Sequence, residues 1–93
     1  MEVLEILGSP VRVRVIQVLL DKGPLNHADL LQELDLPVVT IYTHLQKMTK
    51  AGVLEKEEDD RRTVLYKVRK EALKDAKDFI TGWLEKEEGL CLE

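Results

Sequence analysis

One stretch in the middle of the chain, LPVVTIYTHLQKMTKAG at residues 36–52, restricts the possible folds more than any other. Within it, Ile41, Leu45 and Met48 recur at positions i, i+4 and i+7, a spacing that places three apolar side chains in one stripe along a helix. The glycine that closes the stretch stands where glycine commonly ends a helix. We therefore predict a helix over residues 38–51 that buries one face. Its opposite face carries threonine, tyrosine and glutamine side chains, which a core does not need.

Two helices are predicted upstream of this stretch. The apolar residues 2–7 form a short helical segment, and residues 10–22 form a longer one. Ser9 suits the N-cap and Pro10 suits the first helical position, while a Lys-Gly pair suits the end of the longer helix. Valines and arginines alternate in the first half of that segment, which is also typical of a strand. The capping residues and a length of about twelve residues favour a helix.

The residues on either side of the central helix complete most of the predicted order. Asn26 is a second N-cap candidate, and it precedes a short helix at 27–34 and then a turn. Residues 53–58 and 63–68 are predicted to form two strands joined by a short hairpin loop with the sequence DDRR.

A last helix is predicted over residues 69–88, and its apolar stripe is wider than one small domain can cover. The stripe follows a 3-4-3 spacing, and Phe79 widens it. A chain of 93 residues buries a modest share of its surface, so association is a plausible source of further stability. We therefore predict a homodimer built on residues 2–7 and 69–88. The predicted interface residues are Leu4, Leu73, Ala76, Ile80, Trp83 and Leu84.

The predicted order is three helices, a recognition helix, a two-stranded wing and a C-terminal helix, which is the plan of a winged helix-turn-helix. This is a mainly α fold with a β-hairpin, of the α+β kind. The length fits a single domain over residues 1–93.

Three motifs resemble those of the ArsR-type regulators. LGSPVRVRVIQVLL resembles the opening of that family, in which a small residue and a proline precede two arginines. LPVVTIYTHLQKMTKAGVL resembles its recognition helix, and RRTVLYKV resembles its second wing strand. The resemblance runs from about residue 6 to residue 68. MarR-like and archaeal viral winged-helix proteins share the same plan.

The resemblance implies a transcriptional regulator that binds double-stranded DNA, with residues 8–68 as the DNA-binding core. The second helix of such a motif enters the major groove with its first residues against the base edges. Threonine and glutamine can bond to bases there, apolar groups can meet the thymine methyl, and Tyr42 can reach a phosphate. Lysines late on the helix and arginines at the hairpin tip would contact the backbone or the minor groove. The predicted DNA contacts are Val39, Thr40, Tyr42, Thr43, Gln46, Lys47, Lys50, Arg61 and Arg62.

Several side chains in this region also have purely structural interpretations. Tyr42 could cover the turn, and His44 is better explained as a partly buried packing residue than as a base contact. Arg12 and Arg14 match the family pattern, yet both could form salt bridges with acidic segments of the same chain. The hairpin loop, with four acidic residues in EEDDRR, could be only a solvated loop with local ion pairs.

The net charge of −4 runs against DNA binding, because DNA-binding domains are usually basic. The acidic excess is confined to residues 71–93, with seven acidic and three basic side chains, so it could face away from a polyanion. The rival hypothesis is a winged-helix protein-interaction module without DNA binding, which the acidic hairpin strand favours. Retention on DNA at low salt separates the two, because phosphate contacts are steeply salt-dependent.

The sequence offers no set of residues for catalysis or metal binding. Ser9 is the only serine and is explained as a cap, while His27 and His44 fall in different predicted elements. No Gly-rich phosphate loop or nucleophile elbow occurs. ArsR metal sensors carry paired cysteines or Asp/His pairs, whereas this chain has Cys91 alone and no histidine after His44. We expect no enzyme, no cofactor and no bound metal.

The remaining predictions concern the cell compartment and the cysteine. No apolar run is long enough to span a membrane and the N-terminus lacks a signal peptide's basic region, so we expect a cytoplasmic protein, in a host cell if viral. Nine Lys and eleven Glu against one Asn and three Gln follow the trend of hyperthermophile proteins. Such proteins keep intracellular disulfides, and an odd cysteine invites pairing between chains. We therefore predict an interchain disulfide between the Cys91 residues of the dimer, with a free thiol as the alternative.

Overall fold

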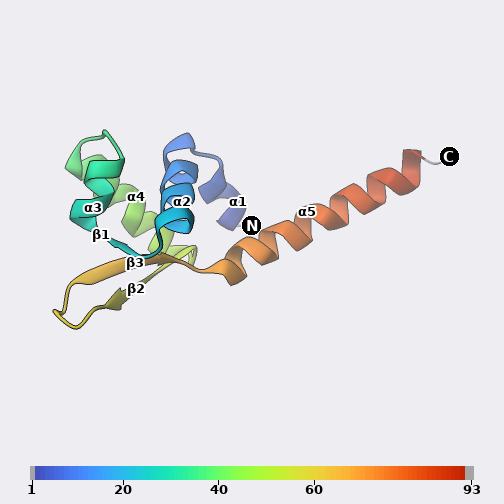
Figure 1. Cartoon of the computed structure of the whole chain (residues 1–93). Coiled ribbons are helices and arrows are strands. Elements are labelled where there is room, and N and C mark those ends of the chain that lie inside the picture. Colours follow the sequence, from blue (N-terminus) through green and yellow to red (C-terminus); the bar gives the residue numbers. More distant parts are fainter. Residues whose placement is uncertain (1, 92–93) are drawn as a thin grey trace.

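The computed structural model describes residues 2–91, with side chains described up to Glu85. Four helices and a small sheet form one body, and a long fifth helix projects from it (Figure 1). The architecture is the predicted mainly α winged helix-turn-helix, with the β2–β3 hairpin as the wing. In chain order the elements are α1 (Glu2–Leu7), α2 (Pro10–Lys22), β1 (Leu25–Asn26), α3 (His27–Glu33), α4 (Val38–Lys50), β2 (Leu54–Glu58), β3 (Val64–Val68) and α5 (Lys70–Cys91).

The core forms where α2, α3 and α4 meet above the sheet (Figure 1). Ile41, Leu45 and Met48 of α4 have no exposed surface, which confirms the buried stripe predicted for this helix. Burying side chains of this size stabilises the fold by about 1.5–3 kcal/mol each. Because these three residues fix one face of α4 against the core, its opposite face is held towards solvent.

The helix ends follow the predicted capping residues, with one exception. The Asn26 side chain accepts a hydrogen bond from the Asp29 backbone N–H at 2.8 Å, which confirms it as the N-cap of α3. Ser9 occupies the N-cap position of α2, but its side chain makes no capping hydrogen bond, so Pro10 at the first turn is the main local start signal. Gly52 has a φ of +81°, which ends α4 and turns the chain into β2.

The sheet has one strand more than the sequence predicted. Its order is β1-β3-β2, with both pairs antiparallel, and the predicted strands of the wing pair from Leu54–Val68 to Glu58–Val64. β1 pairs Leu25 with Tyr66 on the other edge of β3. A strand of two residues is too short to show any period in a sequence. This short strand ties the helical body to the base of the wing.

The wing continues into α5 with almost no linker. Arg69 alone separates β3 from α5. Its backbone N–H donates to the Val53 carbonyl at 2.9 Å, and its Nη1 donates to the Gly52 carbonyl at 3.2 Å. The junction is therefore bonded to the segment that links α4 to β2, although α5 itself projects beyond the body (Figure 1).

The apolar stripe of α5 divides into two parts, which corrects one sequence prediction. Ala72 and Ala76 are buried in the chain's own core, and α5 packs against α1 at this end. Ala76 is only 3% exposed, so its prediction as a dimer contact is wrong: it has almost no surface left for a partner. Leu73 is half-buried against the core. The exposed part of the stripe consists of Phe79, Ile80, Trp83 and Leu84.

Candidate nucleic-acid interface

The outward face of α4 is the centre of the candidate interface. Val39, Thr43 and Gln46 are all exposed and follow one another at i, i+4 and i+7, so they form a second stripe along the helix. This stripe begins two residues before the buried one, a step of about 200°, so the two stripes lie on opposite sides. Tyr42 borders the outer stripe at 47% exposure, and Thr40 is half-buried.

The hydroxyl of Thr43 is already engaged within α4. Its Oγ1 donates a hydrogen bond to the Val39 carbonyl at 2.8 Å, and Thr49 bonds to Leu45 in the same way. A hydroxyl that gives its proton to the helix keeps only its lone pairs for an external partner. Thr43 therefore presents an acceptor and a methyl group, but no donor, on the outer stripe.

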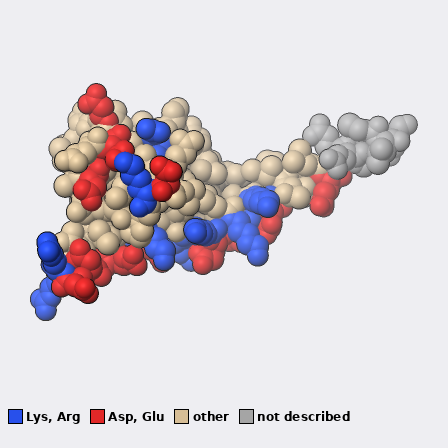
Figure 2. All heavy atoms as spheres, viewed as in Figure 1, with Lys and Arg blue, Asp and Glu red and all other residues tan. Residues whose placement is uncertain are grey.

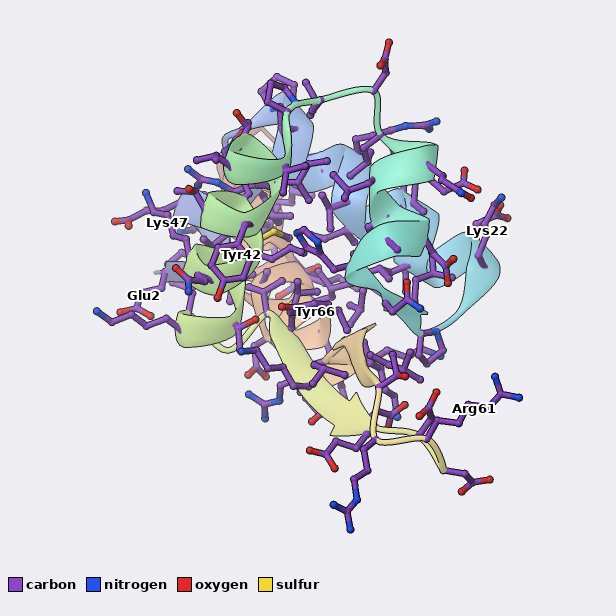
Figure 3. All side chains as sticks on the ribbon, turned by 90° about the vertical axis from the view of Figure 1, so that its left-hand side faces the viewer. Glu2, Lys22, Tyr42, Lys47, Arg61 and Tyr66 are labelled. Carbon is purple, nitrogen blue, oxygen red and sulfur yellow. The ribbon has the colours of Figure 1, made fainter. Side chains whose placement is uncertain are left out.

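Tyr42 packs against α3 and is also partly exposed to solvent. Its ring packs edge-on against His27 of α3, with ring centroids 5.8 Å apart and planes at 81°, so it covers part of the α3–α4 contact. Nearly half of the side chain remains exposed to solvent (Figure 3). The phenol is thus held in place by one edge while its surface stays available to a ligand.

Arg12 and His44 form a hydrogen bond between α2 and α4. Arg12 Nε donates to His44 Nδ1 at 3.2 Å, and Arg12 Nη1 donates to the Glu5 backbone carbonyl at 3.2 Å. Burial first, and then the positive charges of Arg12 and Lys47, lower the pKa of His44. The intramolecular interpretation of Arg12 is the one its contacts fit, but its partners are an imidazole and a carbonyl rather than acidic side chains. His44 is a half-buried packing residue.

The tip of the wing is shaped by an aspartate that the sequence analysis did not single out. Asp59 Oδ1 accepts hydrogen bonds from the backbone N–H groups of Arg61 and Thr63, both at 2.9 Å. Arg62 adopts a φ of +61°, and its backbone N–H donates to the Asp59 carbonyl at 2.9 Å. The sequence signal was an Asp two residues before Arg61, the spacing at which an Asp side chain bonds to the backbone in an Asx-turn. One of the four acidic residues is therefore used to build the loop.

The cationic side chains of the candidate interface are exposed. Lys47 and Lys50 lie in the last turn of α4, and Arg61 and Arg62 project at the wing tip, which Figure 2 shows as a small basic end beside acidic atoms. Within residues 2–85, the ion pair that forms joins Lys22 to Glu33, away from these four side chains. The structure therefore leaves their charges available to an anionic partner.

Three other sequence predictions concern bound metal, membrane-spanning helices and the cysteine. Among residues 2–85, no three His, Cys, Asp or Glu side chains gather as metal ligands would. In the described part of the chain, no helix combines the length and the apolar character that crossing a membrane requires. The Cys91 side chain lies outside the described side chains. A single cysteine forms no bridge within its own chain, and the interchain disulfide has no support here.

Two helices joined by a turn, with an exposed second helix and a hairpin wing, define a winged helix-turn-helix protein. Residues 7–57 match the family model described as a helix-turn-helix domain. An HTH-type transcriptional regulator of Methanocaldococcus jannaschii is 34% identical over 68 residues, which cover 70% of each chain. The chain therefore belongs to the helix-turn-helix family of transcriptional regulators, which are not enzymes.

Solved structures of other regulators share this fold. An ArsR family transcriptional regulator matches with a TM-score of 0.79 at 18% identity, covering 94% of this chain and 88% of that one. The cadmium sensor CMTR of Mycobacterium tuberculosis matches with a TM-score of 0.64 at 25% identity, covering 72% and 67%. The fold is therefore that of ArsR-like winged helix-turn-helix proteins, in agreement with the fold that the three sequence motifs implied.

Proposed function

We propose that this protein binds duplex DNA sequence-specifically as a homodimer, with α4 in the major groove and the wing on the backbone or in the minor groove. The observation that carries the proposal is that the buried stripe and the exposed stripe lie on opposite sides of α4. One stripe is fully buried, so the helix is fixed in the body, and the other is exposed along its whole length. A recognition helix needs this combination of a fixed axis and a free face.

The charge distribution supports the same arrangement in spite of the net charge of −4. Lys47, Lys50, Arg61 and Arg62 are exposed on α4 and the wing, where phosphates would pass. The acidic excess belongs to residues 71–93, and the described part of that segment beyond Ala76 projects away from the body that carries α4 (Figure 1). These four exposed cations are therefore available to the phosphates of a duplex that lies against α4.

The dimer in this proposal rests on the exposed part of the α5 stripe. Trp83 is 54% exposed and packs edge-on against Phe79, with ring centroids 4.7 Å apart. An apolar cluster of this kind marks an association site. A two-fold dimer would place two recognition helices about 34 Å apart, which matches successive major grooves.

The proposal is tested by selecting binding sites from a random duplex library and titrating the enriched duplex. The Thr43→Ala/Gln46→Ala variant should lose about 1–3 kcal/mol of binding for each base-contacting side chain that it truncates. The Gln32→Ala/Thr81→Ala variant is the matched control, because it removes the same exposed residue types from α3 and α5. Binding by the α4 variant that equals wild-type binding would refute the role of this helix.

A protein-interaction module remains the second candidate, and one observation favours it. β2 is an edge strand of the sheet, and all its residues after Leu54 are exposed, three of them glutamates. An exposed acidic edge suits a basic partner. If no duplex is enriched and the protein does not bind DNA at low salt, this candidate replaces DNA binding.

A further inference from the structure

We propose that the outer stripe of α4 recognises thymine methyl groups through Val39, so that the target half-site carries A·T base pairs beneath this helix. The inference rests on the proposed function and specifies its ligand. It follows from the chemistry of the stripe, which combines exposed methyl groups with a glutamine and contains no cation.

Val39 is the most exposed large apolar side chain in the described part of the chain, at 75%, and its neighbour Val38 is 55% exposed. Neither valine is needed by the core, which is filled on the opposite side of the helix by Ile41, Leu45 and Met48. Exposed apolar surface on a binding face indicates an apolar ligand group. In the major groove, the apolar group that varies with sequence is the C5-methyl of thymine.

Thr43 extends the methyl surface by one helical turn. Its Oγ1 donates to the Val39 carbonyl at 2.8 Å, so the hydroxyl proton is not available to a base. Such a hydroxyl cannot donate to guanine O6 or N7, which are both acceptors. What Thr43 offers to a base pair is its methyl group and the lone pairs of its oxygen.

The rest of the stripe also favours A·T pairs. Gln46 stands one turn beyond Thr43, and a glutamine can bond to adenine N6 and N7 together. From Val38 to Gln46 the helix contains no arginine or lysine, the residues that bond to guanine O6 and N7 in pairs. The lysines of α4 begin at Lys47, late on the helix, where phosphates are the expected partners.

The experiment replaces single thymines with deoxyuridine in the duplex enriched by selection. Deoxyuridine keeps Watson–Crick pairing and lacks only the C5-methyl group. At one thymine in a half-site, the replacement should weaken wild-type binding about fourfold, the effect of uncovering one methyl-sized group. The Val39→Ala variant should bind the thymine duplex more weakly than wild type, and it should bind the thymine and deoxyuridine duplexes equally.

Two further variants make the test specific to Val39. The Leu20→Ala variant, which shortens an exposed apolar side chain on α2, should keep the wild-type ratio of thymine to deoxyuridine affinity. The Val39→Thr variant, which exchanges one methyl for a hydroxyl at nearly constant volume, should lower that ratio. Both positions are exposed, so neither change removes core packing.

The outcomes separate this inference from the proposed function. If a specific duplex is enriched but replacing its thymines with deoxyuridine never lowers the affinity, the methyl inference is wrong and DNA binding stands. The same holds if the Val39→Ala variant keeps the wild-type preference for thymine. If no duplex is enriched at all, the proposed function fails and the inference fails with it.

Discussion

At the scale of single residues, the bond between Arg12 and His44 has a consequence for stability. Arg12 donates from its Nε to the imidazole Nδ1 and from its Nη1 to the Glu5 carbonyl, so one guanidinium links α2 with both α1 and α4. An imidazole that accepts at Nδ1 is neutral at that nitrogen. Protonation of His44 would remove the acceptor and place a second positive charge beside Arg12.

This bond predicts a pH dependence of folding. The pKa of His44 is lowered from its ordinary value of 6.5, by burial above all. The unfolded chain therefore binds a proton before the folded chain does as the pH falls. The contribution of His44 to the free energy of unfolding is complete above pH 6.5 and is lost as the pH falls from there towards the lowered pKa.

Urea denaturation at pH 7.5 and pH 5.5 measures the effect in wild type and in the His44→Gln variant. Glutamine keeps an acceptor for Arg12 but does not titrate. Wild type should lose more stability than the variant over this interval. Equal losses in the two proteins would show that His44 does not titrate with a lowered pKa.

At the scale of elements, the wing is held by its tip and its base. The turn around Asp59 fixes the tip, and pairing of β3 with both β1 and β2 fixes the base. Arg61 and Arg62 therefore start from a defined backbone, although their side chains extend into solvent. Phosphate contacts from such a loop position a protein on DNA without specifying sequence.

We expect the wing to contribute a part of the affinity for DNA that depends on salt but not on sequence. The Arg61→Ala/Arg62→Ala variant should bind all duplexes more weakly, and the slope of log affinity against log salt should flatten by about 0.9 for each phosphate that the variant no longer neutralises. The Lys74→Ala/Lys77→Ala variant removes the same charge from exposed positions on α5 and should leave the slope unchanged. Titrations at several salt concentrations decide the question, and identical slopes in the two variants would place the wing off the DNA.

The elements themselves were largely predictable from the sequence, because their signals are local. The period of Ile41, Leu45 and Met48 and the cap at Asn26 are read within a few residues. β1 was missed because two residues carry no period. The Arg12–His44 bond and the buried position of Ala76 were missed for another reason: both depend on residues that are distant in sequence and meet only in the fold.

At the scale of the whole molecule, the structure is a body with a projecting helix. The principal extents are 58 × 27 × 22 Å, and α5 accounts for the long dimension (Figure 1). The half of α5 nearest the body is anchored by Ala72 and Ala76, whereas the next turns expose Phe79, Ile80 and Trp83. A single chain leaves this apolar surface in water, which is the physical reason to expect a second copy.

The dimer prediction is tested by sedimentation at micromolar concentration. Wild type should sediment as a dimer, and the Trp83→Ala variant should dissociate with a dissociation constant at least about 30-fold higher, since truncating a central aromatic side chain costs about 2 kcal/mol or more. Glu85→Ala, two residues further along the exposed helix, is the control and should remain dimeric. Monomeric wild type, with and without DNA, would overturn the dimer.

The junction at Arg69 gives the molecule the mechanics of a lever. A flexible linker would absorb any tilt of α5, but here one residue joins the helix to β3, and that residue is bonded to the Val53 and Gly52 carbonyls. A tilt of α5 would therefore displace the wing and the end of α4 together. In a dimer of such chains, the angle between the two α5 helices would set the distance between the two α4 helices.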